Sequence, residues 1–234
     1  MSEVETSWTL IRGAAKGDKG SQKRFYARYE TVIRSTLTAM WHGLKPMPDI
    51  DDAAQEVLTE CLKKEGVLSK ADPERGSFRG YLYKTTVNVA MRFGDRRKRK
   101  LQQHQNQPPD ENYFDTLAKE EPSAASEFHC KWKQMIVRNA LELLIKEAEQ
   151  DPEILQRMQL LQLLHVEEKK WEEIVDLHPE WVNGSGKPKA QLKAMHRRAQ
   201  KEFMEAIRKV IGIHSPGTPA DIQREYDILF PNTK

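Results

Sequence analysis

The sequence has few cysteines and no long apolar run. Cys61 and Cys130 are the only two cysteines among 234 residues, and they lie far apart in the chain. Two isolated thiols exclude a disulfide framework and a cysteine-rich zinc site, and they fit a reducing compartment. No run approaches the roughly eighteen apolar residues of a transmembrane helix, and the first residues lack the pattern of a secretory signal. We therefore expect a cytoplasmic protein that does not insert into a membrane.

Sequence signatures of enzymes are also missing. The chain contains no glycine-rich phosphate loop, no Gly-x-Ser-x-Gly and no His-Glu-x-x-His. The seven histidines are scattered, and His129-Cys130 has no second pair at metal-binding spacing. The sequence therefore predicts a protein that is not an enzyme, with no catalytic residues, no cofactor and no metal.

Strand signals are scarce, and helical periodicity extends through most of the chain. Between residues 51 and 62, for example, apolar side chains recur at steps of three and four: Ala54, Val57, Leu58, Cys61 and Leu62. This spacing is typical of an amphipathic helix with one buried face. We predict an all-α protein.

Composition divides the chain into two helical domains. Residues 101–126 are rich in Gln, Asn, Pro and acidic residues and lose the apolar periodicity, which indicates a flexible linker. The predicted domains are therefore a four-helix domain over residues 1–100 and a second helical domain over residues 127–212, ending at Gly212. Residues 213–234 form a tail.

The tail carries the signals of one short helix. Thr218 can cap it, Pro219 suits its first position, and Ile222, Tyr226 and Leu229 fall on one apolar face. A helix of about twelve residues is marginal alone in water, so we expect it to dock on one of the two domains. The C-terminal domain is favoured because the tail is joined to it.

Charge is segregated along the chain. The net charge is +7 over residues 1–100, −9 over residues 101–186 and +5 over residues 187–234. Charge blocks can be ordinary solvated faces, but two basic segments around an acidic one also indicate two contacts with a polyanion.

Three helical segments carry distinctive side chains. Residues 51–62 have a polar face opposite their apolar stripe. Residues 78–100 combine aromatic residues with a terminal cluster of Arg and Lys, which suits single-stranded nucleic acid. A basic helix over residues 188–211 follows a short helix over residues 171–177 across a turn, which is the plan of a helix-turn-helix.

The order of these features resembles the RNA polymerase sigma factors of the extracytoplasmic-function type, in the sigma-70 superfamily. The likeness is carried by four stretches: GDKGSQKRFYARYETVIR, IDDAAQEVLTECL, DPERGSFRGYLYKTTVNVAMRFGDRRKRK, and WEEIVDL with KAQLKAMHRRAQKEF. The chain departs from the family pattern at Tyr81, where Trp is usual, at Arg92, where Asp is usual, and in a longer turn before the last basic helix.

The resemblance implies a region 2-like N-terminal domain, a region 4-like helix-turn-helix domain, and a role as a transcription initiation factor. Such a protein binds core RNA polymerase and directs it to promoters through their −10 and −35 elements. The polymerase-binding residues would be Asp51, Asp52, Gln55 and Glu56. The DNA-binding residues would be Asn88, Arg92, Arg96, Arg97 and Arg99 for the −10 element, and Lys189, Lys193, Arg197 and Arg198 for the −35 element.

The resemblance also assigns a task to the loop over residues 67–77 and to the start of the helix after it. Together they would hold a base flipped out of the −10 strand. The implied partners are core RNA polymerase and promoter DNA. An anti-sigma factor is a further candidate partner, as a regulator.

Two other functions fit parts of the sequence. A stand-alone helix-turn-helix transcriptional regulator would need the last basic helix but not the acidic face over residues 51–56. An RNA-binding or antitermination module would use the basic helix ends. Binding to core polymerase distinguishes both from an initiation factor.

Overall fold

A computed structural model describes most of the chain, and every element in the described part is helical. The predicted all-α class is confirmed. Two compact units divide the chain: residues 1–135 with 211–234, and residues 136–210. Within the described residues, none of the helices combines the length and the apolar character that crossing a membrane requires. The described residues are 7–44, 47–63, 66–70, 77–104, 122–182, 186–214 and 218–231.

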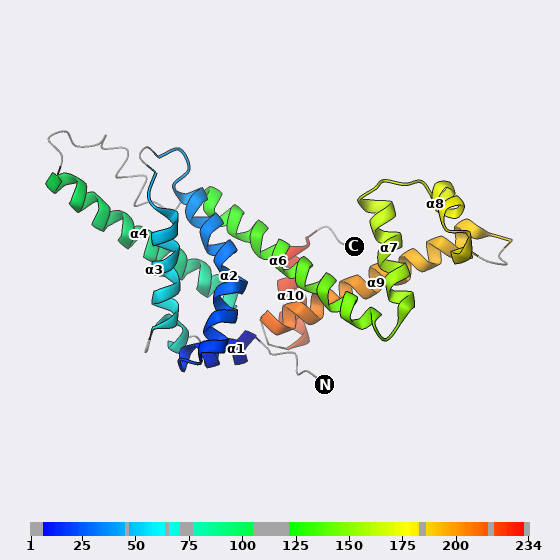
Figure 1. Ribbon diagram of the computed structural model, residues 1–234, viewed down its shortest axis with the longest axis horizontal. Helices are drawn as coiled ribbons and strands as arrows, with labels where there is room; N and C mark the ends of the chain where they lie inside the picture. The colour runs from blue at the N-terminus through cyan, green and yellow to red at the C-terminus, as the bar shows by residue number, and fades with distance from the viewer. Residues whose placement is uncertain are drawn as a thin grey trace. The chain divides into compact units, whose positions relative to one another are not determined.

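The first unit begins with helices that lie beside one another (Figure 1). The caps follow from local chemistry: the Asp18 carboxylate accepts from the Ser21 N–H, and the Asp49 carboxylate accepts from the Asp51 and Asp52 N–H groups. These elements are α1 (Ser7–Ala15), α2 (Lys19–Met40), α3 (Ile50–Leu62), the short 3₁₀ helix η1 (Val67–Lys70) and α4 (Phe78–His104).

An aromatic cluster forms the centre of this unit. Tyr29 of α2 packs its ring 5.3 Å from that of Phe78 and 5.8 Å from that of Trp132, centroid to centroid. Trp132 lies on α6 (Pro122–Ala148) and is 1% exposed. Burying so large a side chain groups the first part of α6 with the N-terminal helices, whereas the sequence places residues 127–135 in the second domain.

The segment expected to be a linker is described only at its ends. Residues 101–104 continue α4 and residues 122–126 begin α6, so both helices extend further than the sequence indicates. Residues 105–121 lie outside the described part of the chain.

The second unit is built around a compact apolar core. Its elements after α6 are α7 (Pro152–His165), α8 (Trp171–Leu177), η3 (Pro179–Val182) and the first part of α9 (Pro188–His214). The buried core residues come from all four elements: Leu160, Leu163, Ile174, Trp181, Val182 and Leu192. The helices predicted over residues 171–177 and from Pro188 are present.

The end of α9 and the tail helix belong to the first unit. Gly212 does not end α9 as predicted: the helix continues to His214. A Cβ at Gly212 would lie 3.1 Å from Ile222 Cδ1, so the missing side chain lets α10 (Pro219–Leu229) pack closely. The predicted helix and its Thr218 cap are confirmed.

The tail helix docks against parts of both predicted domains: Arg79 of the N-terminal one, and Gly212 and Lys133 of the favoured C-terminal one. Tyr226 and Leu229 of α10 are buried within the first unit, and Glu225 forms an ion pair with Arg79 at the start of α4. A partner 146 residues away in sequence gives no local signal from which this ion pair could be read.

His214 is buried in the aromatic cluster. Its Nδ1 lies 3.2 Å from the Tyr29 hydroxyl, and its ring meets Tyr29 and Trp132 edge-on. Burial, with a smaller contribution from the charge of Arg28, lowers the pKa of His214 to about 3. The imidazole is therefore neutral in the folded protein at neutral pH.

This buried histidine predicts a pH-dependent stability. Between pH 6.5 and about 3 the unfolded chain takes up a proton that the folded chain does not, so the free energy of unfolding falls as the pH falls. One such proton contributes up to about 1.4 kcal/mol per pH unit. We expect His214→Gln to show a correspondingly shallower decline in chemical denaturation between pH 6.5 and 4. His42→Gln, at an exposed position, is the control. Equal slopes of the free energy of unfolding against pH for wild type and His214→Gln would contradict the prediction.

Candidate functional site

The polar face of α3 is solvent-accessible. Asp51, Asp52 and Gln55 are exposed and Glu56 is partly exposed, so the structure places all four predicted polymerase-binding residues on the surface. The opposite face is buried in the first unit: Ala53, Ala54, Val57, Leu58 and Cys61. Desolvation raises the pKa of the Cys61 thiol to about 12, which makes it a packing residue rather than a nucleophile.

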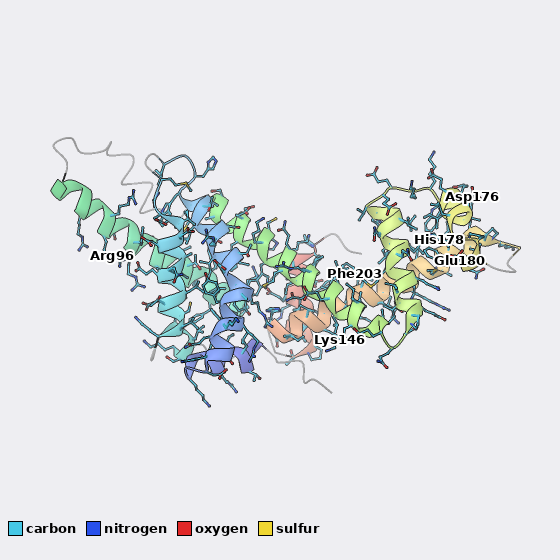
Figure 2. All side chains as sticks on the ribbon, viewed as in Figure 1. Arg96, Lys146, Asp176, His178, Glu180 and Phe203 are labelled. Carbon is cyan, nitrogen blue, oxygen red and sulfur yellow. The ribbon has the colours of Figure 1, made fainter. Side chains whose placement is uncertain are left out.

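One face of α4 carries a row of polar and basic side chains. Asn88, Arg92, Arg96 and Arg99 follow one another at steps of four, four and three, and all are exposed. Arg96 is labelled on α4 in Figure 2. Arg97 departs from this row: it is partly buried, and its Nε has no hydrogen-bond partner in the described part of the chain. The structure therefore brings together four of the five residues predicted for the −10 element, with Arg97 beside them.

The acidic side of α3 and the basic row of α4 contact each other. Glu56 pairs with Arg96, and one turn away Glu60 lies 3.9 Å from Arg92. Because residue numbers rise on α3 as they fall on α4, the two helices are antiparallel and their charges form a ladder. A residue predicted to bind polymerase is thus joined directly to one predicted to bind DNA.

Two ion-pair partners were missed by the sequence reasoning. Glu60 extends the acidic row by one turn and also binds Lys63 at 2.7 Å, a hydrogen bond that lowers the pKa of Glu60. Its place four residues after Glu56 was an available signal. Arg34 of α2 pairs with Asp51, and no sequence pattern links those two positions.

An open hollow lies beside Asn88 and Arg92. Its wall is fixed by the Tyr81 hydroxyl, which donates to the Val67 carbonyl at 2.6 Å and so holds η1 against α4. Residues 71–76 of the loop expected to hold a flipped base lie outside the described residues. The hollow is lined by Val67, Thr85, Asn88, Met91, Arg92 and Asp95.

The second unit carries its own basic row on α9. Lys189, Lys193 and Arg197 are spaced four residues apart and exposed, opposite the buried Leu192 and Ala199. Arg198 is exposed but stands one position off this row. Lys189 pairs with Glu172 of α8. The row begins at a shallow hollow lined by Lys187, Pro188, Lys189, Ala190 and Lys193.

The longer turn before α9 has a structural role. His178 stacks on Trp181 with ring centroids 3.9 Å apart, and its Nδ1 lies 2.9 Å from Glu180 Oε1. His178 and Glu180 are labelled in Figure 2. This arrangement buries Trp181 and Val182 of η3 in the core of the second unit. Trp181 and Val182 therefore enlarge the core of the second unit beside Ile174 of α8 and Leu192 of α9.

Buried Arg157 holds α7 against α9. Its side chain is 9% exposed and donates to Glu202 of α9 at 2.7 Å, to Glu153 at 2.8 Å and to Asp151 at 3.2 Å. A second link joins the same helices where His165 Nε2 lies 3.1 Å from His196 Nε2. These contacts fix the helix that presents the basic row.

Comparison of the chain with protein-family models, curated proteins and solved structures found no match. In the described residues no three His, Cys, Asp or Glu side chains gather in a group that could hold a metal ion.

The Arg157 contacts predict a local loss of stability. Removing one partner of a buried ion pair costs several kcal/mol, but the three carboxylates here remain partly in water, so we expect Arg157→Ala to cost about 2 kcal/mol. Amide exchange should accelerate in α7 and in the turns of α9 around Glu202 and stay unchanged in α2 and α3. Lys201→Ala, at an exposed α9 position, serves as control, and unchanged exchange in α7 would contradict the prediction.

Proposed function

We propose that this protein is a transcription initiation factor that joins core RNA polymerase in the cytoplasm and directs it to promoters. The observation that carries the proposal is the placement of an exposed acidic face on α3 directly beside the basic row of α4, in the stretches that resemble sigma factors. A separate basic row on α9 supports a second DNA contact.

Polymerase binding uses the α3 face. Asp51, Asp52, Gln55 and Glu56 offer acceptors for arginine and lysine side chains of a basic partner, and charge-assisted bonds suit such a contact. Arg34 and Arg96 already hold two of these carboxylates. Exposed pairs of this kind are worth about 1 kcal/mol or less, so a partner's arginines can replace them at low cost.

The α4 row contacts the −10 element. Arg96, Arg97 and Arg99 bind backbone phosphates, while Asn88 and Arg92 stand at the hollow that would receive a flipped base. Unstacking a base costs a few kcal/mol, and hydrogen bonds from Asn88 and Arg92 at the hollow can offset part of that cost. Phosphate contacts along α4 contribute the remainder.

The α9 row contacts the −35 element. Lys189, Lys193, Arg197 and Arg198 line the exposed side of the second helix of a helix-turn-helix, which is the helix that enters the major groove. An anti-sigma factor, where one exists, would act by covering one of these surfaces.

A stand-alone helix-turn-helix regulator is the second candidate. It is favoured by the α9 row taken alone, because that row needs no polymerase. It leaves the exposed α3 face without a task, as does an RNA-binding or antitermination module. Co-purification of the tagged protein with core RNA polymerase tests the proposal, and absence of binding would contradict it.

Reversing charge on α3 should abolish polymerase binding. Asp52→Lys with Gln55→Lys places two cations where a basic partner is expected, and both positions are exposed, so helicity by circular dichroism should not change. The control is Glu142→Lys with Gln134→Lys, the same chemistry at exposed positions of α6. Equal retention of polymerase by both variants would contradict the assignment.

Neutralising the α4 cluster should reduce the salt dependence of promoter binding. For Arg96→Gln, Arg97→Gln and Arg99→Gln together, the log–log slope of affinity against salt should fall by about one unit for each phosphate that the protein no longer neutralises. The control replaces Lys16, Lys19 and Lys23 with Gln, which removes the same charge at exposed positions. Fluorescence anisotropy of the holoenzyme on promoter DNA measures both, and an unchanged slope excludes backbone contact by this cluster.

A further inference from the structure

The tail helix α10 places one carboxylate among basic groups of the first unit. Glu225 is 7% exposed, and its two oxygens accept from Arg79 Nε at 2.6 Å and from Arg79 Nη2 at 3.4 Å. Lys133 of α6 lies over the Phe230 ring, 4.8 Å from its centroid. His129, one turn before Lys133, has its pKa lowered by burial and then by the charges of Arg79 and Lys133, while Glu225 opposes them.

The geometry of this contact is that of an anion site. A buried carboxylate is costly unless it is paired and hydrogen-bonded, and here a guanidinium provides two donors to its two oxygens. Arginine binds phosphate oxygens with the same two-donor geometry. Arg79 lies in the first turn of α4, so this contact is on the helix that also carries the Asn88–Arg99 row.

Glu225 lies on a short helix whose structure depends on docking. An isolated helix of eleven residues is at best marginally stable in water. The contacts of the docked α10 include the Arg79 ion pair, buried Tyr226 and Leu229, Ile222 against Gly212, and Phe230 beneath Lys133. A competitor for Arg79 therefore weakens the docking of the whole helix.

We propose that α10 is an autoinhibitory segment whose Glu225 occupies a phosphate-binding site provided by Arg79. When α10 undocks, this site binds a backbone phosphate of single-stranded nucleic acid. The proposed function supplies the identity of the phosphate; the occupied anion site itself does not depend on it.

The test compares two variants of the full chain that remove the same charge from the same helix. Glu225→Gln removes the buried carboxylate, whereas Asp227→Asn removes an exposed one. The probe is a fluorescent single-stranded oligodeoxynucleotide of mixed sequence, titrated by anisotropy at several salt concentrations. Each additional phosphate that the protein neutralises on a single strand adds about 0.7 to the salt slope, which is about fivefold in affinity at 0.1 M salt.

We expect Glu225→Gln to bind about fivefold more tightly at 0.1 M salt, with a slope larger by about 0.7, and Asp227→Asn to match wild type. Adding Arg79→Gln to Glu225→Gln should remove the increase in affinity. In wild type at low salt, the oligonucleotide should accelerate amide exchange over residues 219–229. Inorganic phosphate in the same assay distinguishes a site for free phosphate, which it would block at millimolar concentration, from one that needs a strand.

Two results would overturn the inference: equal affinities of Glu225→Gln and Asp227→Asn, or an increase in affinity that persists without Arg79. A failure of all variants to bind the oligonucleotide would overturn it as well. Core polymerase binding is measured in parallel with the same proteins. If wild type does not bind core polymerase, the proposed function is contradicted and the anion site is unaffected. If wild type binds polymerase but Glu225→Gln binds the oligonucleotide no more tightly, the inference alone is contradicted.

Discussion

Burial of Trp132 against Tyr29 is the contact on which the first unit depends. It joins α6 to α2 and α4, although about a hundred residues separate the two rings in sequence. His214 meets both rings and so brings the end of α9 to the same cluster. Once α6 and α9 are fixed there, the tail that follows α9 lies within reach of α4. The position of α10 is therefore a consequence of aromatic packing, not of its own ion pair alone.

The α3–α4 ladder gives the charged residues two tasks. In the isolated chain Glu56 and Arg96 satisfy each other, and the pair helps align the helices. In the proposed complex each would take an external partner of opposite charge. The same side chains therefore neutralise each other in the free protein and supply its two binding surfaces. This is possible because α3 and α4 present charges of opposite sign side by side.

Local signals in the sequence predict the helices and their faces well. The apolar stripe of α3, the exposed row on α9 and the Thr218–Pro219 start of α10 all depend on neighbours within a few turns. The missed features depend on distant partners. The His214–Tyr29 contact spans 185 residues and the Arg79–Glu225 pair spans 146. Periodicity within one helix carries no information about either contact, so the sequence assigned residues 127–135 to the second domain and gave no sign of the contact between the tail and Arg79.

The ion pairs at the proposed binding surfaces differ in one decisive property. Arg34–Asp51, Arg96–Glu56 and Lys189–Glu172 each have side chains a third or more exposed, so water screens them and an external partner can replace them at a cost of about 1 kcal/mol or less. The side chains of Arg79 and Glu225 are 18% and 8% exposed. Separating them would leave a buried charge without compensation unless another anion enters or the helix undocks. The exposed pairs can therefore exchange partners one at a time. Arg79 can change its partner only when α10 undocks. The Arg79–Glu225 pair therefore controls the position of a whole helix, whereas the other pairs are surface contacts.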